Sequence, residues 1–307
     1  MLEHLPERVS IYEVSLRDGL QNEKATVPLG DKLRLIDALV AAGLERIEVT
    51  SFVSPKWIPQ LADADDLAQA LYSRDREPHV RYSALCPNVI GLERAKAGHL
   101  EEIAIFLSAS ETHNKKNVNH TIAESLAEYR ETVLAARAAR IRVRAYVSTV
   151  WGCPYEGAVD PRRALSIATE LLELGCYQVS LGDTVGVGTP RQTKSILELM
   201  LGEIEAPKIA MHMHDTRGTA LANVLVGLEL GIRDFDASVG GLGGCPYAPG
   251  AAGNCATEDL VYMLQGMGID SGVDLERLVD AGRAAESIVG RKLPGKVHQS
   301  GVRGLRA

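Results

Sequence analysis

Short apolar runs with strand character recur along this chain. They lie at residues 9–14, 46–50, 80–85, 103–107, 143–147, 178–181, 209–213 and 235–239. Between them lie longer stretches whose apolar residues recur at helical spacing, at residues 32–42, 122–137, 163–174, 193–204 and 220–230. Glycines follow several helical turns and are typical of helix ends: Gly43, Gly98, Gly175 and Gly231. The pattern therefore predicts eight strands that alternate with helices.

This alternation predicts parallel strands, because a parallel return needs a crossover connection. Eight such units in about 240 residues fit an α/β fold of the (β/α)8 TIM-barrel type over about residues 8–256. A doubly wound open sheet is the second interpretation. The pattern beyond Thr257 predicts at least two further C-terminal helices over about 257–292, and we expect segment 293–307 to be poorly ordered. No linker or low-complexity segment interrupts the pattern, so we expect a single domain over residues 1–307.

The composition is that of an ordinary globular protein and argues against some partners. The 307 residues are 46% hydrophobic and 24% charged, with a formal net charge of −7. An acidic chain without a dense basic run argues against nucleic acid as the main partner. No run approaches the roughly eighteen apolar residues of a membrane span, and MLEHLPERVS lacks a signal core, so we expect a cytoplasmic protein without a membrane partner. Five cysteines without a CxxC pair favour reduced thiols.

Polar side chains lie at the ends of several predicted strands, where TIM barrels carry their active sites. The positions concerned are Arg17, Asp18, Glu48, Ser51, Tyr146, Asp183, His212 and His214. The eighth run is followed by the glycine-rich segment GGLGGCPYAPGAAGN. We therefore expect a polar site at this end of the barrel.

His212 and His214 lie two residues apart on a predicted strand, so the period of two points both imidazoles to one face. Two imidazoles with a carboxylate and an amide would make a mixed nitrogen and oxygen site for Mg²⁺, Mn²⁺ or Zn²⁺. Asp18 and Asn254 are candidates to complete it. The alternative is that the histidines make only ordinary hydrogen bonds, and sequence spacing does not decide between the two.

Three acidic positions near the strand ends have alternative interpretations. Arg17 and Asp18 form either a structural salt bridge or, followed by Gly19, a clamp for an anionic part of a ligand. Glu48 lies within an apolar strand, where an unpartnered carboxylate is costly, so we expect it to support the site. Asp183 either caps the following turn or presents its carboxylate to the barrel mouth.

Cys245 lies in a loop between glycines and Pro246, which favours a mobile flap. Cys86 and Cys176 fit the more usual role of a cysteine as a small buried hydrophobic residue. A thiol on a flap that closes over a substrate is a candidate to deliver or receive a proton.

At these residues the chain resembles the 3-hydroxy-3-methylglutaryl-CoA lyase family, within a wider group of metal-dependent barrels that includes isopropylmalate and homocitrate synthases. The matching stretches are SLRDGLQNEK, IEVTSFVSPKW, KKNVN, GCPYEG, SLGDTVGVGTP, HMHDT and GLGGCPYAPGAAGNCATEDLVYML. They span the chain from about residue 10 to about residue 290. The resemblance implies a divalent cation, Mg²⁺ or Mn²⁺, with four ligands: Asp18, His212, His214 and Asn254.

The resemblance also implies roles for the surrounding residues. Arg17 would contact the thioester side of the substrate, and Cys245 would be the catalytic thiol. Glu48 and Asp183 would join the catalytic set as polar support around the metal. Further substrate contacts are expected from Ser51, Tyr146 and Asn117. The partner would be an acyl-CoA substrate, and we expect a homodimer.

The implied reaction is a retro-aldol (Claisen) cleavage of a 3-hydroxyacyl-CoA to acetyl-CoA and acetoacetate. The metal would lower the pKa of the 3-hydroxyl, Arg17 would stabilise the enolate, and Cys245 would protonate the enolate carbon. Asp18 and a ligand imidazole are both candidates for the base, of which we favour Asp18. A condensing enzyme, a metal hydrolase and a non-catalytic barrel are the alternatives.

Two positions depart from the family pattern. Val150-Trp151 precedes GCPYEG where a small residue and an aliphatic one are usual, and Cys255 replaces an aliphatic residue after Asn254. An indole that points into the barrel mouth would narrow the acyl pocket and favour a small substituent on C3. An indole that points outward would only pack beneath the turn 152–154. The acyl group accepted by the protein therefore stays open.

Overall fold

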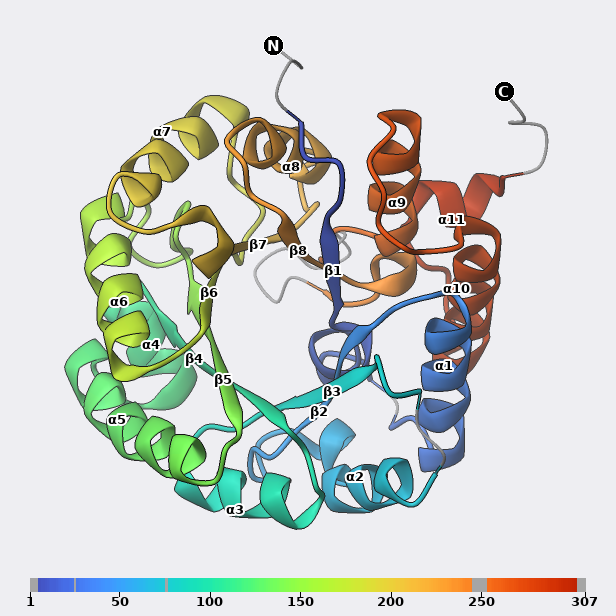
Figure 1. Ribbon diagram of the computed structural model, residues 1–307, viewed down its shortest axis with the longest axis horizontal. Coiled ribbons are helices and arrows are strands. Elements are labelled where there is room, and N and C mark those ends of the chain that lie inside the picture. The colour runs from blue at the N-terminus through green and yellow to red at the C-terminus, as the bar shows by residue number, and fades with distance from the viewer. Residues whose placement is uncertain (1–4, 25, 75–76, 245–252, 303–307) are drawn as a thin grey trace.

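The eight apolar runs form eight parallel strands, which close into one barrel (Figure 1). The computed structural model describes residues 5–24, 26–74, 77–244 and 253–302. The strands are β1 (Ser10–Glu13), β2 (Arg46–Ser51), β3 (Arg81–Leu85), β4 (Glu102–Ser108), β5 (Arg142–Ser148), β6 (Gln178–Asp183), β7 (Ile209–Met213) and β8 (Asp234–Ala237). β8 pairs with β1, where Asp234 lies opposite Ser10. This pairing confirms the TIM barrel and excludes the open sheet.

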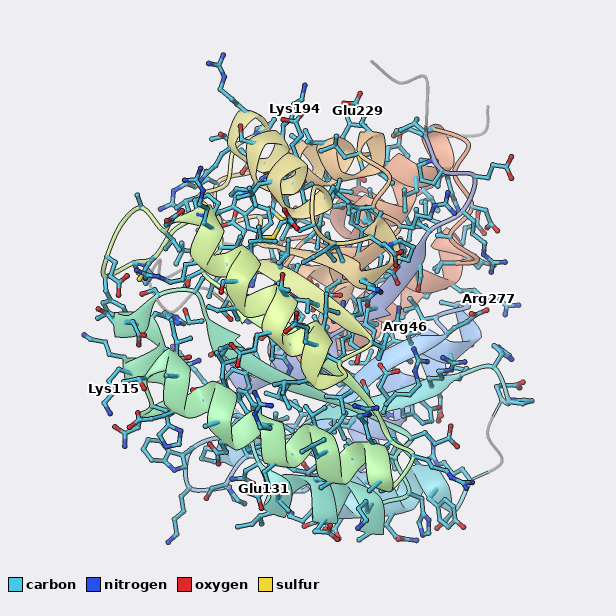
Figure 2. The ribbon with its side chains drawn as sticks, turned by 60° about the vertical axis from the view of Figure 1, so that its left-hand side comes forward. Arg46, Lys115, Glu131, Lys194, Glu229 and Arg277 are labelled. Carbon is cyan, nitrogen blue, oxygen red and sulfur yellow. The ribbon has the colours of Figure 1, made fainter. Side chains whose placement is uncertain are left out.

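A ring of helices surrounds the strands (Figure 1). Most of these helices bury an apolar stripe in the core around the barrel. The helices between strands are α1 (Leu29–Ala41), α2 (Ala64–Tyr72), α3 (Val89–Ala97), α4 (Glu111–Val118), α5 (Ile122–Ala138), α6 (Pro161–Leu174), α7 (Pro190–Leu201) and α8 (Ala220–Glu229). The short helical turns are η1 (Ser15–Gly19), η2 (Pro59–Leu61), η3 (Ala206–Lys208) and η4 (Val239–Gly241). Glu131 on α5 and Lys194 on α7 are on the exposed faces (Figure 2). No helix in the described part of the chain has the length and apolar character needed to cross a membrane.

Three helices follow the barrel: α9 (Thr257–Gly266), α10 (Leu275–Val289) and α11 (Lys296–Ser300). They lie on the side of the barrel where α10 packs against α1 (Figure 1). The expectation of a poorly ordered segment from residue 293 was wrong for residues 293–302. The Asp259 carboxylate accepts hydrogen bonds from the amides of Lys296 and Val297, at 2.9 and 2.6 Å, and thereby fixes the start of α11.

Most glycines that the sequence places at helix ends adopt the left-handed conformation, as Gly175 does after α6 with a φ of 116°. Gly98 is an exception, because its φ is −80°. The next residue, His99, has the positive φ of 56° instead, and its ring stacks on Tyr72 with the centroids 3.6 Å apart. At His99, a ring-stacking contact thus accompanies the left-handed backbone conformation that glycine usually adopts.

The barrel interior contains charged side chains where branched aliphatic residues are usual. Glu48 on β2, Arg144 on β5 and Asp236 on β8 are all buried. Because buried charges are costly unless they are paired, these residues must be satisfied by one another or by a ligand. We therefore expect the partners of these buried charges at the candidate site.

Candidate metal centre and active site

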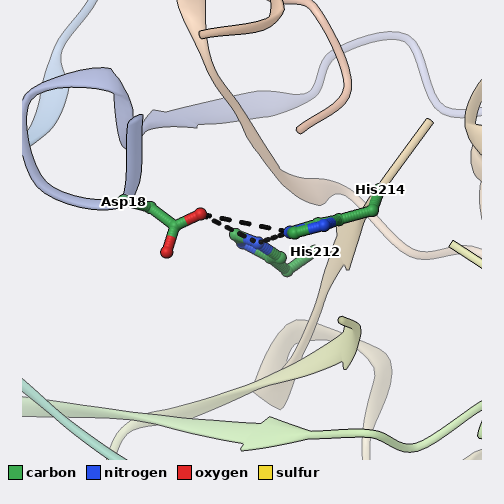
Figure 3. A group of neighbouring side chains, drawn as sticks. All are labelled: Asp18, His212 and His214. Atoms are coloured by element: carbon green, nitrogen blue, oxygen red, sulfur yellow. Dashed lines mark hydrogen bonds and ion pairs between the residues drawn. The ribbon is translucent and has the colours of Figure 1, made fainter. Parts of the chain in front are cut away.

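Asp18, His212 and His214 form a compact group at the end of the barrel that receives the carboxyl ends of β1 and β7 (Figure 3). The histidines lie on and just after β7, and both are buried. Asp18 lies in η1, a π-helical turn in which the Val14 carbonyl accepts hydrogen bonds from the amides of residues 17–19. Such turns frequently occur at functional sites.

One carboxylate oxygen faces two imidazole nitrogens in this group. The Nε2 atoms of His212 and His214 are 3.2 Å apart, and Asp18 Oδ2 lies 3.9 and 4.0 Å from them. All three candidate ligand atoms lie within 4.8 Å of one another. Nitrogen and oxygen donors that converge in this way from two separate elements fit a divalent cation.

The protonation states of the group also suit a cation. Burial alone would raise the pKa of Asp18, but the Arg17 guanidinium and the two imidazoles lower the pKa to about 2. Burial and the neighbouring His212 lower the pKa of His214 to about 4. At neutral pH the group therefore offers an ionised carboxylate and a neutral His214 imidazole, which are the forms that bind metals.

Asn254 lies beside this group, as the sequence predicted. Its backbone forms a β-bridge with His214, and its side-chain nitrogen donates to Asp18 Oδ2 at 2.9 Å and to the Leu242 carbonyl at 3.1 Å. A ligand role requires the amide oxygen to face the cation, which a half-turn of the terminal amide would achieve. Asn254 as a fourth ligand stays a prediction.

Arg17 connects the metal group to Glu48, which is the structural interpretation of the Arg17-Asp18 pair, and its role as a clamp for an anionic ligand stays a prediction. Its Nη1 donates to Asp18 Oδ1 and its Nε donates to Glu48 Oε2, each at 2.5 Å. The guanidinium carbon lies 5.1 Å from the centre of the Tyr146 ring. Among the described residues, Arg17 Nη2 makes no hydrogen bond, which leaves it to contact a ligand.

Glu48 and Tyr146 both lie next to Arg17 and contact each other. The Tyr146 hydroxyl donates to Glu48 Oε2 at 3.2 Å, and the Tyr146 ring meets the His212 ring edge-on. Burial raises the pKa of Glu48 in spite of the adjacent Arg17 guanidinium. The structure therefore places Glu48 and Tyr146 where the sequence predicted, beside the candidate metal group.

No described hydrogen bond or ion pair joins Asp183, Ser51 or Asn117 to the metal group, although Asp183 ends β6 beside β7. Both carboxylate oxygens of Asp183 accept backbone hydrogen bonds, from the amides of Val187 and Gly188 at 3.0 and 2.8 Å, which is the capping alternative. Ser51 is buried at the end of β2, where its hydroxyl donates to the Leu85 carbonyl of β3 at 3.4 Å and accepts from the Val53 amide at 3.2 Å. Asn117 is exposed on α4. Within the described residues these three side chains make no hydrogen bond or ion pair with the metal group, so their catalytic and substrate roles stay predictions.

Cys245 lies outside the described residues. Two residues that flank this segment in the sequence are described and lie next to each other, because a Cβ atom on Gly253 would be 2.8 Å from the Gly244 nitrogen. A Cβ atom on Gly243 would be 2.6 Å from the side-chain nitrogen of Asn254. Only glycine leaves room for this close approach at the edge of the metal group.

Sequence reasoning missed Asp236 and Arg144 as parts of the site. Asp236 Oδ2 lies 3.2 Å from His212 Nδ1, and Arg144 pairs with the same carboxylate. Burial opposes ionisation, but Arg144 and His212 hold the pKa of Asp236 well below its usual range. The available signal was an acidic residue inside the apolar run 235–239, and a basic one inside 143–147.

Comparisons with known proteins place most of the chain in one family. The HMGL-like family model matches residues 8–284. The chain is 51% identical to the mitochondrial hydroxymethylglutaryl-CoA lyase of Rattus norvegicus over 96% of its length and 90% of that protein. It is 49% identical to the 3-hydroxy-3-isohexenylglutaryl-CoA/hydroxy-methylglutaryl-CoA lyase of Pseudomonas aeruginosa, over 94% and 95% of the two chains.

A solved structure is similar over almost the whole chain. It is an HMG-CoA lyase from Acinetobacter baumannii in complex with coenzyme A and 3-methylmalate, with a TM-score of 0.91 and 39% identity. The match covers 98% of this chain and 97% of that one.

Proposed function

The chain belongs to the HMGL-like family and is a carbon–carbon lyase, and we propose that it cleaves 3-hydroxy-3-methylglutaryl-CoA to acetyl-CoA and acetoacetate with a divalent cation. The observation that carries this proposal is the convergence of Asp18, His212 and His214 beside the guanidinium of Arg17. A metal group next to a fixed positive charge suits a reaction in which a hydroxyl loses a proton and an enolate departs.

The donor set of the candidate metal centre fits Mg²⁺ or Mn²⁺. Asp18, His212 and His214 would hold the ion, with Asn254 as a fourth ligand after rotation of its amide. Bound there, the cation supplies Lewis-acid polarisation of the substrate oxygens and lowers the pKa of the 3-hydroxyl. Two imidazoles with oxygen ligands also suit Zn²⁺, so reconstitution with each of the three ions identifies the one that supports turnover.

We propose separate roles for Arg17, Asp18 and Cys245 in the reaction. Arg17 is held by Glu48 and Asp18 on one side, which leaves its Nη2 to stabilise the oxygen of the departing enolate. The pKa of about 2 for Asp18 makes it a weak proton acceptor, which argues against Asp18 as the base. We keep Cys245 as the proposed acid that protonates the enolate carbon.

Release of acetoacetate from 3-hydroxy-3-methylglutaryl-CoA tests the function directly. We expect release that stops after dialysis against EDTA and returns when Mg²⁺ or Mn²⁺ is added, because the ionised carboxylate and neutral imidazole need the cation to activate the substrate. Full activity of the EDTA-dialysed protein would contradict the metal dependence. Cleavage only of a thioester with a longer substituent on C3 would instead favour 3-hydroxy-3-isohexenylglutaryl-CoA, the other substrate named for the Pseudomonas aeruginosa relative.

The Trp151 side chain points toward the helical layer, because its indole Nε1 donates to Thr193 Oγ1 on α7 at 2.9 Å. The indole is 2% exposed and packs in the apolar layer between barrel and helices. This contact supports the outward one of the two alternatives. We therefore infer that residues other than Trp151 set the acyl preference.

We accordingly expect Trp151→Leu to leave the ratio of kcat/KM for methyl and longer 3-alkyl substrates unchanged. It should lower the free energy of unfolding by roughly 2–4 kcal/mol, because it removes packed indole volume and leaves Thr193 without one partner. Trp57→Leu is the matched control, since Trp57 is 81% exposed and its replacement should change stability by less than about 0.5 kcal/mol. A changed substrate profile in Trp151→Leu alone would restore the pocket role.

Two further expectations remain part of the proposal. The similarity to a lyase solved with coenzyme A supports an acyl-CoA substrate for this chain. The homodimer and the cytoplasmic location stay predictions, which light scattering of the purified protein and fractionation of the source cells would check.

A further inference from the structure

A layer of buried polar side chains crosses the barrel beneath the candidate metal group. It is formed by inward-facing residues of four consecutive strands, β5 to β8: Arg144, Ser180, His212 and Asp236. The strand register brings His212 directly opposite Asp236. The side chains of Arg144 and Asp236 are both 0% exposed. Neither residue belongs to the group that would touch the substrate or the cation.

The Asp236 carboxylate is saturated with donors. Its Oδ1 accepts from Arg144 Nη2 at 2.6 Å, and its Oδ2 accepts from Arg144 Nη1 at 3.1 Å. The same Oδ2 accepts from Ser180 Oγ at 2.7 Å and lies 3.2 Å from His212 Nδ1. A carboxylate bound by a guanidinium through both oxygens has only acceptor sites to offer. The imidazole must therefore present its proton at Nδ1.

Arg144 is itself held in place from several sides. Its Nε donates to Gln178 Oε1 at 2.9 Å, and its guanidinium carbon lies 4.3 Å from the centre of the Tyr12 ring. A buried ion pair of this kind adds little stability compared with well-packed apolar residues. Its presence in a barrel interior that aliphatic side chains could fill points to a role in the site above it.

We propose that Asp236, anchored by Arg144, is a positioning residue that fixes His212 as its Nδ1-protonated tautomer and so directs the Nε2 lone pair toward the metal centre. The inference rests on the metal site of the proposed function and assigns the interaction that prepares one of its ligands. His214 lacks an equivalent, because its Nδ1 is buried without a hydrogen-bond partner among the described residues. Of the two histidines, only His212 therefore has a hydrogen-bond partner that fixes its tautomer for metal binding.

The affinity for Mn²⁺, measured by the electron paramagnetic resonance of the free ion, tests the proposal. We expect Asp236→Asn to weaken binding about 10- to 100-fold, because the amide nitrogen can donate to Nδ1 and move the imidazole proton to Nε2. Ser180→Ala is the matched control, since it removes another contact to the same carboxylate oxygen without touching the imidazole. It should change the affinity by less than about threefold, although both variants lose a buried hydrogen bond. Equal affinities for Asp236→Asn and wild type would overturn the proposal.

A second measurement needs no substitution in the layer. The ¹⁵N chemical shifts of the metal-free wild-type protein labelled at histidine report which ring nitrogen carries the proton, and His212→Gln assigns the signal. We expect His212 to be protonated at Nδ1, and protonation mainly at Nε2 would overturn the inference even if Asp236→Asn fails to fold. Failure of the proposed function has a different signature, which is Mn²⁺ binding and the Nδ1 tautomer without any acyl-CoA cleavage.

Discussion

Replacing His212 with alanine should abolish divalent-cation binding and turnover together, while the metal-free protein stays nearly as stable as the metal-free wild type. The variant keeps the Arg144–Asp236 pair and removes one of two imidazoles whose Nε2 atoms lie 3.2 Å apart. The loss of turnover should exceed the roughly 100-fold effect of losing a partner outside the ligand set. Metal content after dialysis, acetoacetate release and unfolding with and without EDTA measure the three effects.

The unfolding experiment compares how much the cation stabilises the wild type and His212→Ala. A cation at about 100 times its dissociation constant should stabilise the wild type by about 2.7 kcal/mol, and this increment should vanish in His212→Ala. His298→Ala is the control, because His298 is also a buried histidine beside a carboxylate, that of Glu286, but lies in α11. The control should keep its bound metal. A His212→Ala protein that binds the cation normally would refute the assignment of the ligand.

Arg17→Met should lower kcat by about 10² or more, because the charge that Arg17 stabilises appears only as the carbon–carbon bond breaks. Arg17→Lys should recover only part of this loss, since an ammonium group does not reproduce a fork that reaches Asp18, Glu48 and a ligand at once. Steady-state kinetics on both variants separates kcat from KM. A raised KM at unchanged kcat would mean that Arg17 only binds the substrate.

A structural explanation of the Arg17 effect can be tested separately. Removal of the guanidinium leaves Glu48 buried without its ion-pair partner, which itself destabilises the protein. The double variant Arg17→Met with Glu48→Gln removes the unpaired carboxylate and should recover stability without recovering kcat. Recovery of both would assign the loss to local structure.

The sequence predicted the barrel well because period-two runs are short and bounded by clear turn signals. The run 209–213 coincides with β7, and the position of both histidines on one face followed from the strand period alone. Helices α2 and α4 were not identified, and α3 was indicated only by Gly98 at its end, because all three are at most nine residues long and offer little periodicity. The ordered tail was missed because its order comes from Asp259, which lies far away in the sequence.

The sequence predicted those residues of the candidate site that lie at the ends of predicted strands, but it did not predict which of them contact one another. Asp18 and Asn254 are separated by most of the chain. The chemistry of a mixed site made them candidates, but only the family resemblance implied that both are ligands. The pairing of Arg144 with Asp236 spans the barrel interior, and strand periodicity does not tell which inward residues face one another. The direction of Trp151 depended on Thr193, a hydrogen-bond partner on another helix.

The positions of Arg17 and Asp18 depend on the exact number of residues in the turn η1. Its hydrogen bond from the Leu20 amide to the Ser15 carbonyl spans five residues rather than the four of an α-helix. Loss of a single residue there would tighten the turn and rotate later side chains by about 100° around its axis. Arg17 and Asp18 would then leave Glu48 and the imidazoles together. Insertions and deletions between β1 and α1 should accordingly be selected against near η1, whereas the loop that carries exposed Trp57 is freer to change length over evolutionary time.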